Sequence, residues 1–190
     1  ESVSIIVKDK CQELEHICEA VFLLRELSPR TQDSIVSNGE LLSSLIIAAA
    51  FDSAGIANHW IDAREIIRTD SHFGSAAPNF DITINTLKEY LKQRKENLFV
   101  IPGFIASDAE GVTTTLGRGG SDYTAAIVAA ATDAASLEIW TDVSGMMTAD
   151  PRIVHNARAI PYISYKEAME LSHFGAKVIY PPTIQPVMKK

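Results

Sequence analysis

The sequence is poor in cysteine, in basic residues and in long apolar runs. Cys11 and Cys18 are its only cysteines, and no signal peptide precedes them, which argues against a disulfide-stapled secreted protein. Lys and Arg number 17 against 24 Asp and Glu, and this acidic balance argues against nucleic acid as the main partner. The longest apolar run, Leu45 to Phe51, is far shorter than the roughly 18 residues of a membrane span. We therefore expect a cytoplasmic protein with reduced thiols and no membrane partner.

Several common site signatures are missing as well. The sequence contains neither Gly-x-x-x-x-Gly-Lys-Ser/Thr nor Gly-x-Gly-x-x-Gly, two glycine-rich motifs that bind phosphates. Its five histidines and two cysteines show no metal-ligand spacing, so we name no metal-ligating residue. No Ser-His-Asp arrangement can be argued either. The sequence thus gives no sign of a P-loop, a Rossmann dinucleotide site, a zinc site or a hydrolase triad.

Apolar residues make up 46% of the chain, enough for a globular core, and their spacing predicts alternating helices and strands. A period near 3.6 predicts helices at about 10–27, 37–54, 81–94, 123–135 and 165–172. Short apolar or β-branched runs predict strands at about 56–62, 98–101, 113–116 and 137–141. This alternation indicates one α/β domain with a largely parallel sheet.

In open α/β sheets, ligands bind on loops beyond the carboxyl ends of the strands. Three segments have that position and the composition of a site, namely 37–44, 116–124 and 140–152. In the first, Gly39 would let the backbone approach a ligand, and Glu40 would lie at a helix start, where the helix dipole favours a carboxylate. The alternative is an ordinary helix N-cap followed by a first-turn acid.

The second segment surrounds Arg118 with three glycines and places Asp122 at the start of an Ala-rich helix. Backbone N–H groups of such a loop suit an anion, and an arginine can hold a carboxylate through two hydrogen bonds. Asp122 could hold an ammonium group beside it. Arg118 and Asp122 together match the two charges of an α-amino acid, although a tight turn with an ordinary Arg–Asp pair is the alternative.

The third segment, Trp140 to Arg152, mixes small, polar and charged residues, as a nucleotide pocket would. A long polar connection with an Asp-Pro turn is the alternative. Further along, Lys177 could meet phosphates as a point charge, but taken alone it is better explained as a solvated lysine, because most lysines are exposed.

Taken together, these segments resemble the catalytic domain of the aspartate kinase family, within the amino-acid kinase superfamily. The resemblance spans nearly the whole chain and is carried by the following pieces: Asn38-Gly39-Glu40-Leu41-Leu42-Ser43, Pro102-Gly103-Phe104-Ile105, Thr113 through Ala125, Ile139 to Val143 with Asp150-Pro151-Arg152, and Phe174-Gly175-Ala176-Lys177-Val178. The Gly-Arg-Gly-Gly-Ser-Asp block is the most specific of them. Trp60 through Arg64 and Arg68-Thr69-Asp70 look closest to the single-function, lysine-sensitive type.

The resemblance implies a three-layer α/β/α sandwich with a mainly parallel central sheet. It also implies an aspartate site lined by Glu40, Phe104, Arg118 and Asp122, with Arg118 on the α-carboxylate and the two acids facing the α-ammonium. ATP would be surrounded by a second group of side chains, consisting of Thr141, Asp142, the Met146–Met147 region, Asp150 and Arg152, with Lys177 on the nucleotide side. Arg118, Asp122 and Lys177 would be the catalytic residues.

The activity implied is transfer of the ATP γ-phosphate to the side-chain carboxylate of L-aspartate, giving 4-phospho-L-aspartate. This is the first step of lysine, threonine and methionine biosynthesis, it uses Mg²⁺, and the full-length protein is expected to be a homodimer. That carboxylate is already an anion at neutral pH, so no general base is needed. Catalysis would consist of positioning and of neutralising the transferring phosphoryl group.

Three features depart from the family pattern. No Lys-Φ-Gly-Gly-Thr-Ser phosphate loop occurs in the 190 residues, no regulatory ACT domain follows, and Met147 stands where a tyrosine commonly contacts the nucleotide. We therefore expect a partial kinase domain, cut at both ends and inactive by itself. The alternatives are another amino-acid kinase and a non-catalytic remnant that binds aspartate or nucleotide.

Overall fold

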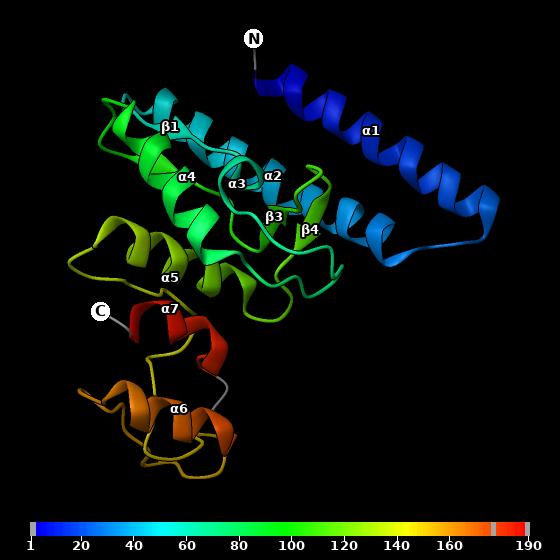
Figure 1. Cartoon of the computed structure of the whole chain (residues 1–190). Helices are drawn as coiled ribbons and strands as arrows, with labels where there is room; N and C mark the ends of the chain where they lie inside the picture. Colours follow the sequence, from blue (N-terminus) through cyan, green and yellow to red (C-terminus); the bar gives the residue numbers. More distant parts are fainter. Residues whose placement is uncertain (1–2, 176–177, 189–190) are drawn as a thin grey trace. The chain divides into compact units, whose positions relative to one another are not determined.

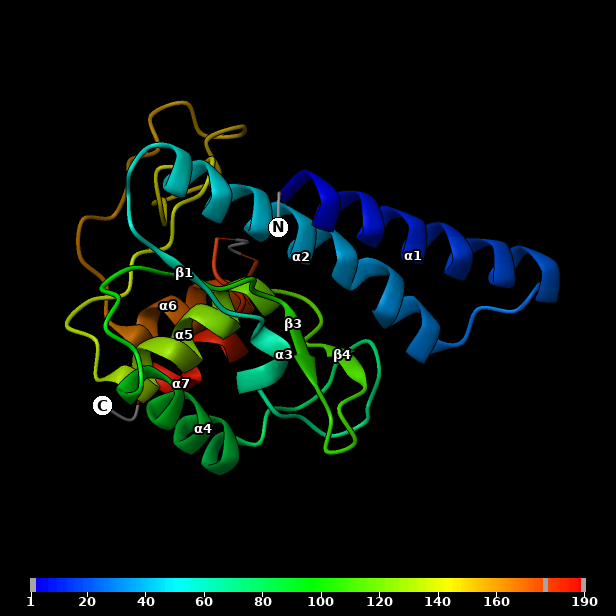
Figure 2. The same ribbon diagram turned by 90° about the horizontal axis from the view of Figure 1, so that it is seen from above.

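Two long helices form the first part of the chain in the computed structural model, which describes residues 3–175 and 178–188. Helix α1 spans Val3–Leu24 and α2 spans Pro29–Ser53, and the two pack side by side in opposite directions (Figures 1 and 2). Ser28 caps α2, because its Oγ accepts a hydrogen bond from the Thr31 N–H at 3.1 Å, and Pro29 occupies the first helical turn. The second predicted helix therefore begins at Pro29 and not at Ser37.

The chain divides into two compact units, Glu1–Ser121 and Asp122–Lys190. In the first unit, strand β1 (His59–Trp60) pairs in parallel with β2 (Phe99–Val100), and β3 (Ile105–Ser107) pairs antiparallel with β4 (Thr113–Thr115). A parallel bridge joins Arg68 to Ser107. The predicted parallel pairing thus holds for β1–β2 and for this bridge, whereas β3 and β4 form a hairpin.

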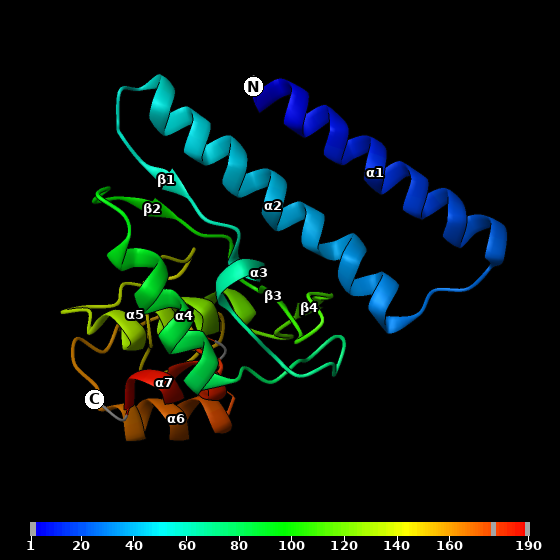
Figure 3. The same cartoon turned by 45° about the horizontal axis from the view of Figure 1, so that its top comes forward.

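Helix α2 packs against β1, β2 and β4, and Figure 3 shows it lying along this side of the unit. Two further helices complete the unit, α3 (Ala63–Ile66) and α4 (Phe80–Lys92), and α3 contacts both α4 and β3. The core between these elements is aliphatic, and its fully buried large side chains include Ile61, Ile66, Ile67, Leu87 and Ile105. Burial of each such side chain contributes about 1.5–3 kcal/mol.

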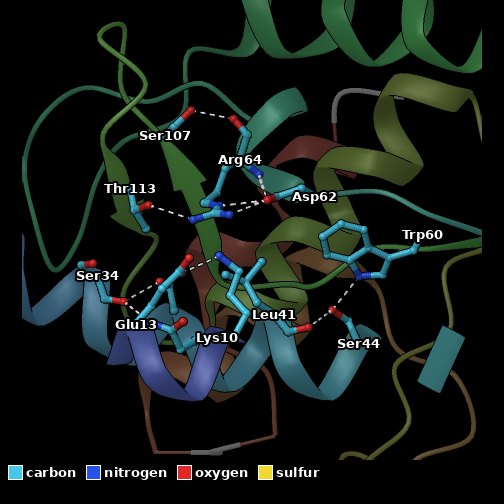
Figure 4. A network of polar contacts seen from close by, with 12 residues as sticks. Lys10, Glu13, Ser34, Leu41, Ser44, Trp60, Asp62, Arg64, Ser107 and Thr113 are labelled. Atoms are coloured by element: carbon cyan, nitrogen blue, oxygen red, sulfur yellow. Dashed lines mark hydrogen bonds and ion pairs between the residues drawn. The ribbon is translucent and has the colours of Figure 1, made fainter. Parts of the chain in front are cut away.

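The Trp60–Arg64 segment ties this unit together through polar contacts (Figure 4). The Asp62 carboxylate accepts hydrogen bonds from the backbone N–H and the guanidinium of Arg64, with an Oδ2–Nη2 distance of 2.6 Å. This contact raises the pKa of Arg64. Arg64 also donates to Thr113 Oγ1 at the start of β4, and Trp60 Nε1 donates to Ser44 Oγ on α2 at 2.9 Å. The segment that suggested a family subtype therefore has a structural role of its own.

The second unit contains helices α5 (Gly120–Thr132), α6 (Tyr165–His173) and α7 (Gln185–Met188) and the 3₁₀ turn η1 (Pro181–Ile184). A long irregular segment separates α5 from α6, whereas η1 leads directly into α7. Helix α5 starts with the last two residues of the first unit. Ser164 and Glu167 form a capping box at the start of α6.

The strand predicted at 137–141 is wrong. No strand pairs with this segment within residues 3–175 and 178–188, and Trp140 is 89% exposed. An apolar run forms a strand only when a second strand pairs with it and hydrogen-bonds its backbone N–H and C=O groups. The local sequence pattern does not show whether such a second strand is present.

Helix α2 is long and apolar enough to cross a membrane by length and composition, and it is the one such helix in the described part of the chain. Its most apolar window has a mean hydropathy of 1.5 and is 28% buried. The continuous apolar run in the sequence is shorter than the helix because Ser, Asn and Gly interrupt it. The buried face of α2 is nevertheless largely polar and includes Asp33, Ser37, Asn38 and Ser44.

Candidate active site

Glu40 lies in the middle of α2 and not on a loop that leads into a helix. The prediction of a helix start at Ser37-Asn38-Gly39-Glu40 is therefore wrong. Ser37 and Asn38 look like capping residues in the sequence, but their side chains donate to the Ser34 carbonyl one turn earlier, both at 2.8 Å. As a result, the half-buried Glu40 is carried by a rigid helix.

Arg118 lies on a tight loop between β4 and α5, where the sequence placed it. Gly117 and Gly119 on either side have φ angles of +70° and +71°, a conformation that favours glycine. The Gly120 N–H donates to the Gly117 carbonyl at 3.0 Å and closes the turn. The Arg118 side chain is exposed. This geometry presents a guanidinium at the end of a strand, which suits a carboxylate ligand.

Phe104 packs against this loop and shapes it. Its φ angle is +72°, which is uncommon for a residue with a side chain and persists only where the surroundings enforce it. The Phe104 carbonyl accepts a hydrogen bond from the Leu116 N–H at 2.9 Å. A Cβ atom on Gly120 would lie 2.8 Å from Phe104 Cδ2, and one on Gly103 would lie 2.8 Å from the Ser121 Cα. The structure therefore brings Phe104 and the Arg118 loop into direct contact, with no room for larger residues.

Asp122 lies in the first turn of α5, as predicted. It is half-buried, and desolvation raises the pKa of its carboxyl above the ordinary aspartate value. A carboxylate that loses hydration in this way gains from a cationic partner. This property is compatible with an ammonium ligand.

The residues predicted around ATP lie in the irregular stretch between α5 and α6. Asp150 and Arg152 are brought together, because the Arg152 guanidinium donates to both carboxylate oxygens at 3.0 and 2.7 Å, and this contact raises the pKa of Arg152. Thr141 Oγ1 accepts from the Val143 N–H at 3.1 Å, which forms a local turn, and Asp142 beside it is exposed.

Met147 forms an antiparallel bridge with Ala159. The flanking backbone hydrogen bonds, from Thr148 to the Arg158 carbonyl and from Ile160 to the Met146 carbonyl, extend this pairing. Met147 therefore has a defined backbone position. Lys177, predicted on the nucleotide side, lies outside the described residues.

Sequence reasoning missed Asp33, which is 2% exposed and accepts three hydrogen bonds from Gly74 and Thr115. One signal was available. Asp33, Ser37 and Glu40 recur at helical spacing on the same side of α2 as the core residue Leu41. A carboxylate on a core-facing stripe requires buried donors.

Comparison with known proteins decides the family. A model described as the amino acid kinase family matches residues 7–190 of the chain. The chain belongs to the amino acid kinase family.

Two curated members of this family illustrate the similarity. The lysine-sensitive aspartokinase 3 of Escherichia coli is 40% identical over 184 residues, covering 94% of this chain and 41% of that protein. A bifunctional aspartokinase/homoserine dehydrogenase of Buchnera aphidicola is 38% identical over 185 residues, covering 96% of this chain and 22% of that protein. The chain thus spans less than half the length of these relatives.

Solved structures of the family agree. Aspartokinase III of E. coli in complex with aspartate and ADP has a TM-score of 0.93 at 38% identity, covering all of this chain and 42% of the solved chain. The aspartate kinase of Clostridium acetobutylicum has a TM-score of 0.72 at 40% identity over 83% of this chain and 34% of that one. These neighbours confirm the predicted α/β amino-acid kinase fold.

Proposed function

We propose that the chain forms part of the catalytic centre of an aspartate kinase, which transfers the ATP γ-phosphate to the side-chain carboxylate of L-aspartate. The observation that carries the proposal is the Arg118 loop, bounded by two glycines of positive φ and pressed against the strained Phe104. The similarity to an aspartokinase III that binds aspartate and ADP supports it. Under this proposal the chain is a partial kinase domain.

On the aspartate side, Arg118 holds the α-carboxylate, Glu40 and Asp122 face the α-ammonium, and Phe104 forms a wall. The glycine-bounded loop supports the role of Arg118, because it exposes a guanidinium at the end of β4. The raised pKa of Asp122 supports its role, because an ammonium ligand would compensate the desolvation of this carboxyl. Arg118 and Asp122 are then catalytic residues that position the substrate for in-line transfer.

On the nucleotide side, ATP is surrounded by Thr141, Asp142, Met147, Asp150 and Arg152. Lys177 contacts the ATP phosphates. The Asp150–Arg152 pair is exposed, with 83% of the Arg152 side chain accessible, so a phosphate could compete for this guanidinium at little cost. Nucleophile activation is unnecessary because the substrate carboxylate is already ionised.

Mg²⁺ accompanies ATP in this proposal. The described residues contain no group of three His, Cys, Asp or Glu side chains that could hold a metal. In this proposal the ion is bound mainly through the nucleotide phosphates, where it neutralises negative charge. We further propose a cytoplasmic homodimer as the state of the full-length protein.

The test is calorimetric titration of the chain with L-aspartate, with succinate and glutamate as controls, together with ADP release by the full-length gene product. We expect aspartate to bind selectively, because succinate lacks the ammonium group and glutamate is one methylene longer. Equal binding of succinate and aspartate would contradict the proposed roles of Glu40 and Asp122.

A substitution isolates Arg118. Arg118→Ala should lose about 2–4 kcal/mol of aspartate binding, because the substrate carboxylate would lose its charged partner. The control is Arg94→Ala, which removes an exposed arginine that stacks on Tyr90. An Arg118→Ala variant that binds aspartate within threefold of the parent would remove Arg118 from the site.

A further inference from the structure

We propose that Asp33 is a positioning residue for the aspartate site, which sets the Arg118 loop relative to Glu40. This inference rests on the proposed function. Asp33 acts through backbone on which both side chains depend. Three observations support it, namely its own hydrogen bonds, the packing of Gly117, and its register on α2.

The Asp33 carboxylate connects three segments of the first unit. Its Oδ2 accepts hydrogen bonds from the Gly74 N–H at 2.9 Å and the Thr115 N–H at 3.0 Å, and its Oδ1 accepts from Thr115 Oγ1 at 2.8 Å. The side chain is 2% exposed, so water does not compete for these donors. One buried carboxylate therefore fixes α2, the end of β4 and the loop around Gly74 to one another.

These contacts reach the base of the Arg118 loop. Thr115 is the last residue of β4, and its carbonyl accepts from the Ala76 N–H at 2.8 Å. Gly117 rests directly on the Gly74 loop, since a Cβ there would lie 3.1 Å from the Gly74 carbonyl oxygen and 3.2 Å from Ser75 Cβ. Asp33 thus holds both the strand that leads to Arg118 and the surface on which Gly117 packs.

The same carboxylate also fixes Glu40. Asp33 and Glu40 are seven positions apart on α2, two helical turns, so both point to the same side about 10.5 Å apart along the axis. A helix is stiff over this distance. Anchoring α2 at Asp33 therefore sets where Glu40 stands with respect to the Arg118 loop.

The chemistry of Thr115 provides a selective test. In Asp33→Ala, two backbone N–H groups and one hydroxyl lose their acceptor. In Asp33→Asn, the amide oxygen can accept from both N–H groups while the amide nitrogen donates to Thr115 Oγ1, because a hydroxyl can reverse its role. Asp33→Asn therefore keeps the hydrogen-bond geometry and removes only the charge. If Asp33 is a positioning residue, this variant should bind aspartate like the parent, whereas it should not if the charge of Asp33 acts on the substrate.

The experiment is steady-state kinetics of the full-length gene product. We expect Asp33→Ala to raise the KM for aspartate at least about tenfold while the KM for ATP stays within twofold, and Asp33→Asn to restore the parent value. Asp62→Ala is the matched control, since it removes another carboxylate whose contacts lie in the same unit and are made to Arg64 and not to Gly74 or Thr115. It should lower the melting temperature and leave the KM for aspartate unchanged.

Thr115→Val covers the case in which Asp33→Ala does not fold, because it removes only the hydroxyl donor. It should raise the KM for aspartate about threefold without changing that for ATP. An aspartate KM unchanged in every folded Asp33 and Thr115 variant, or raised equally by Asp62→Ala, would overturn the inference alone. A parent protein that binds ATP but not aspartate would overturn the proposed function with it.

Discussion

Two charged side chains show how single residues are adapted to their surroundings. The exposed Arg118 extends from a loop whose shape is enforced by glycines, while the half-buried Asp122 has a raised pKa because it loses hydration. A guanidinium is well hydrated at the surface, whereas a partly buried carboxylate is destabilised until a cation approaches it. Both properties are local, and each can be tested with one substitution.

Aspartate binding should depend on pH through Asp122. Its carboxyl has a pKa above the ordinary value of 3.8, so it takes up a proton earlier than a solvated aspartate as the pH falls. A protonated carboxyl cannot pair with the substrate ammonium, so affinity for aspartate should fall as the pH drops from about 7 towards 4. Titration calorimetry across this range measures the effect.

The stability effect of the same group has the opposite sign. Because burial disfavours the charged form, the ionised Asp122 opposes folding at neutral pH, and protonation relieves this cost as the pH falls through the raised pKa. Asp122→Asn should remove this dependence and weaken aspartate binding at neutral pH. An aspartate affinity with the same acidic limb in Asp122→Asn would assign that limb to another group.

At the scale of the element, α2 connects the helical and the sheet parts of the first unit. Its start is set by Ser28 and Pro29, and its buried polar face carries the Asp33 contacts. Gly39 lies within it, although glycine lowers helix stability. Apart from the backbone of α2 itself and the two adjacent residues, no atom of the described residues lies within 4 Å of where its Cβ would be.

Gly39→Ala should raise the free energy of unfolding by about 0.5–1 kcal/mol, because alanine loses less conformational entropy in a helix. Urea denaturation measures it. The control is Gly103→Ala, which should destabilise the protein because its Cβ would lie 2.8 Å from the Ser121 Cα. Destabilisation by Gly39→Ala would contradict the helical position of this residue and favour the capping turn that the sequence suggested.

At the scale of the whole molecule, the length and hydropathy of α2 meet the criteria for a membrane span, but its buried face is largely polar. Asp33, Ser37, Asn38 and Ser44 face protein donors and acceptors, and Ser44 accepts from Trp60 Nε1 at 2.9 Å. Transfer of these groups and of Glu40 into hydrocarbon would cost several kcal/mol.

The chain should therefore remain in the aqueous fraction when it is mixed with phospholipid vesicles and floated on a density gradient. The expected result is no lipid-associated protein at physiological salt, with a hydrophobic transmembrane peptide as the positive control. Stable flotation of the folded chain after a high-salt wash would show that α2 or its neighbours bind the bilayer.

Local patterns predicted helices whose apolar residues recur at helical spacing within one segment. The periodicity of Asp81 to Arg94 predicted α4 at Phe80–Lys92, and the Ala-rich run predicted α5. The same reasoning failed at 137–141, where a strand requires a partner, and at Ser37, where the side chain bonds within the helix and does not cap it. The candidate Arg118 loop was predictable because a cluster of glycines in a sequence indicates a tight turn with positive φ angles, which Gly117 and Gly119 have.

By itself, the sequence determined the family, the α/β class and the glycine-bounded loop that carries Arg118, because these depend on residue types at short spacing. Only the tertiary structure showed that Glu40 lies in the middle of a helix and that Phe104, at a φ angle of +72°, packs closely against Gly120. It also showed that the Asp33 carboxylate accepts hydrogen bonds from Thr115, 82 positions along the chain. The physical reason is that a buried carboxylate gains its stability from donors brought to it by folding. Spacing along the chain contains no record of those donors.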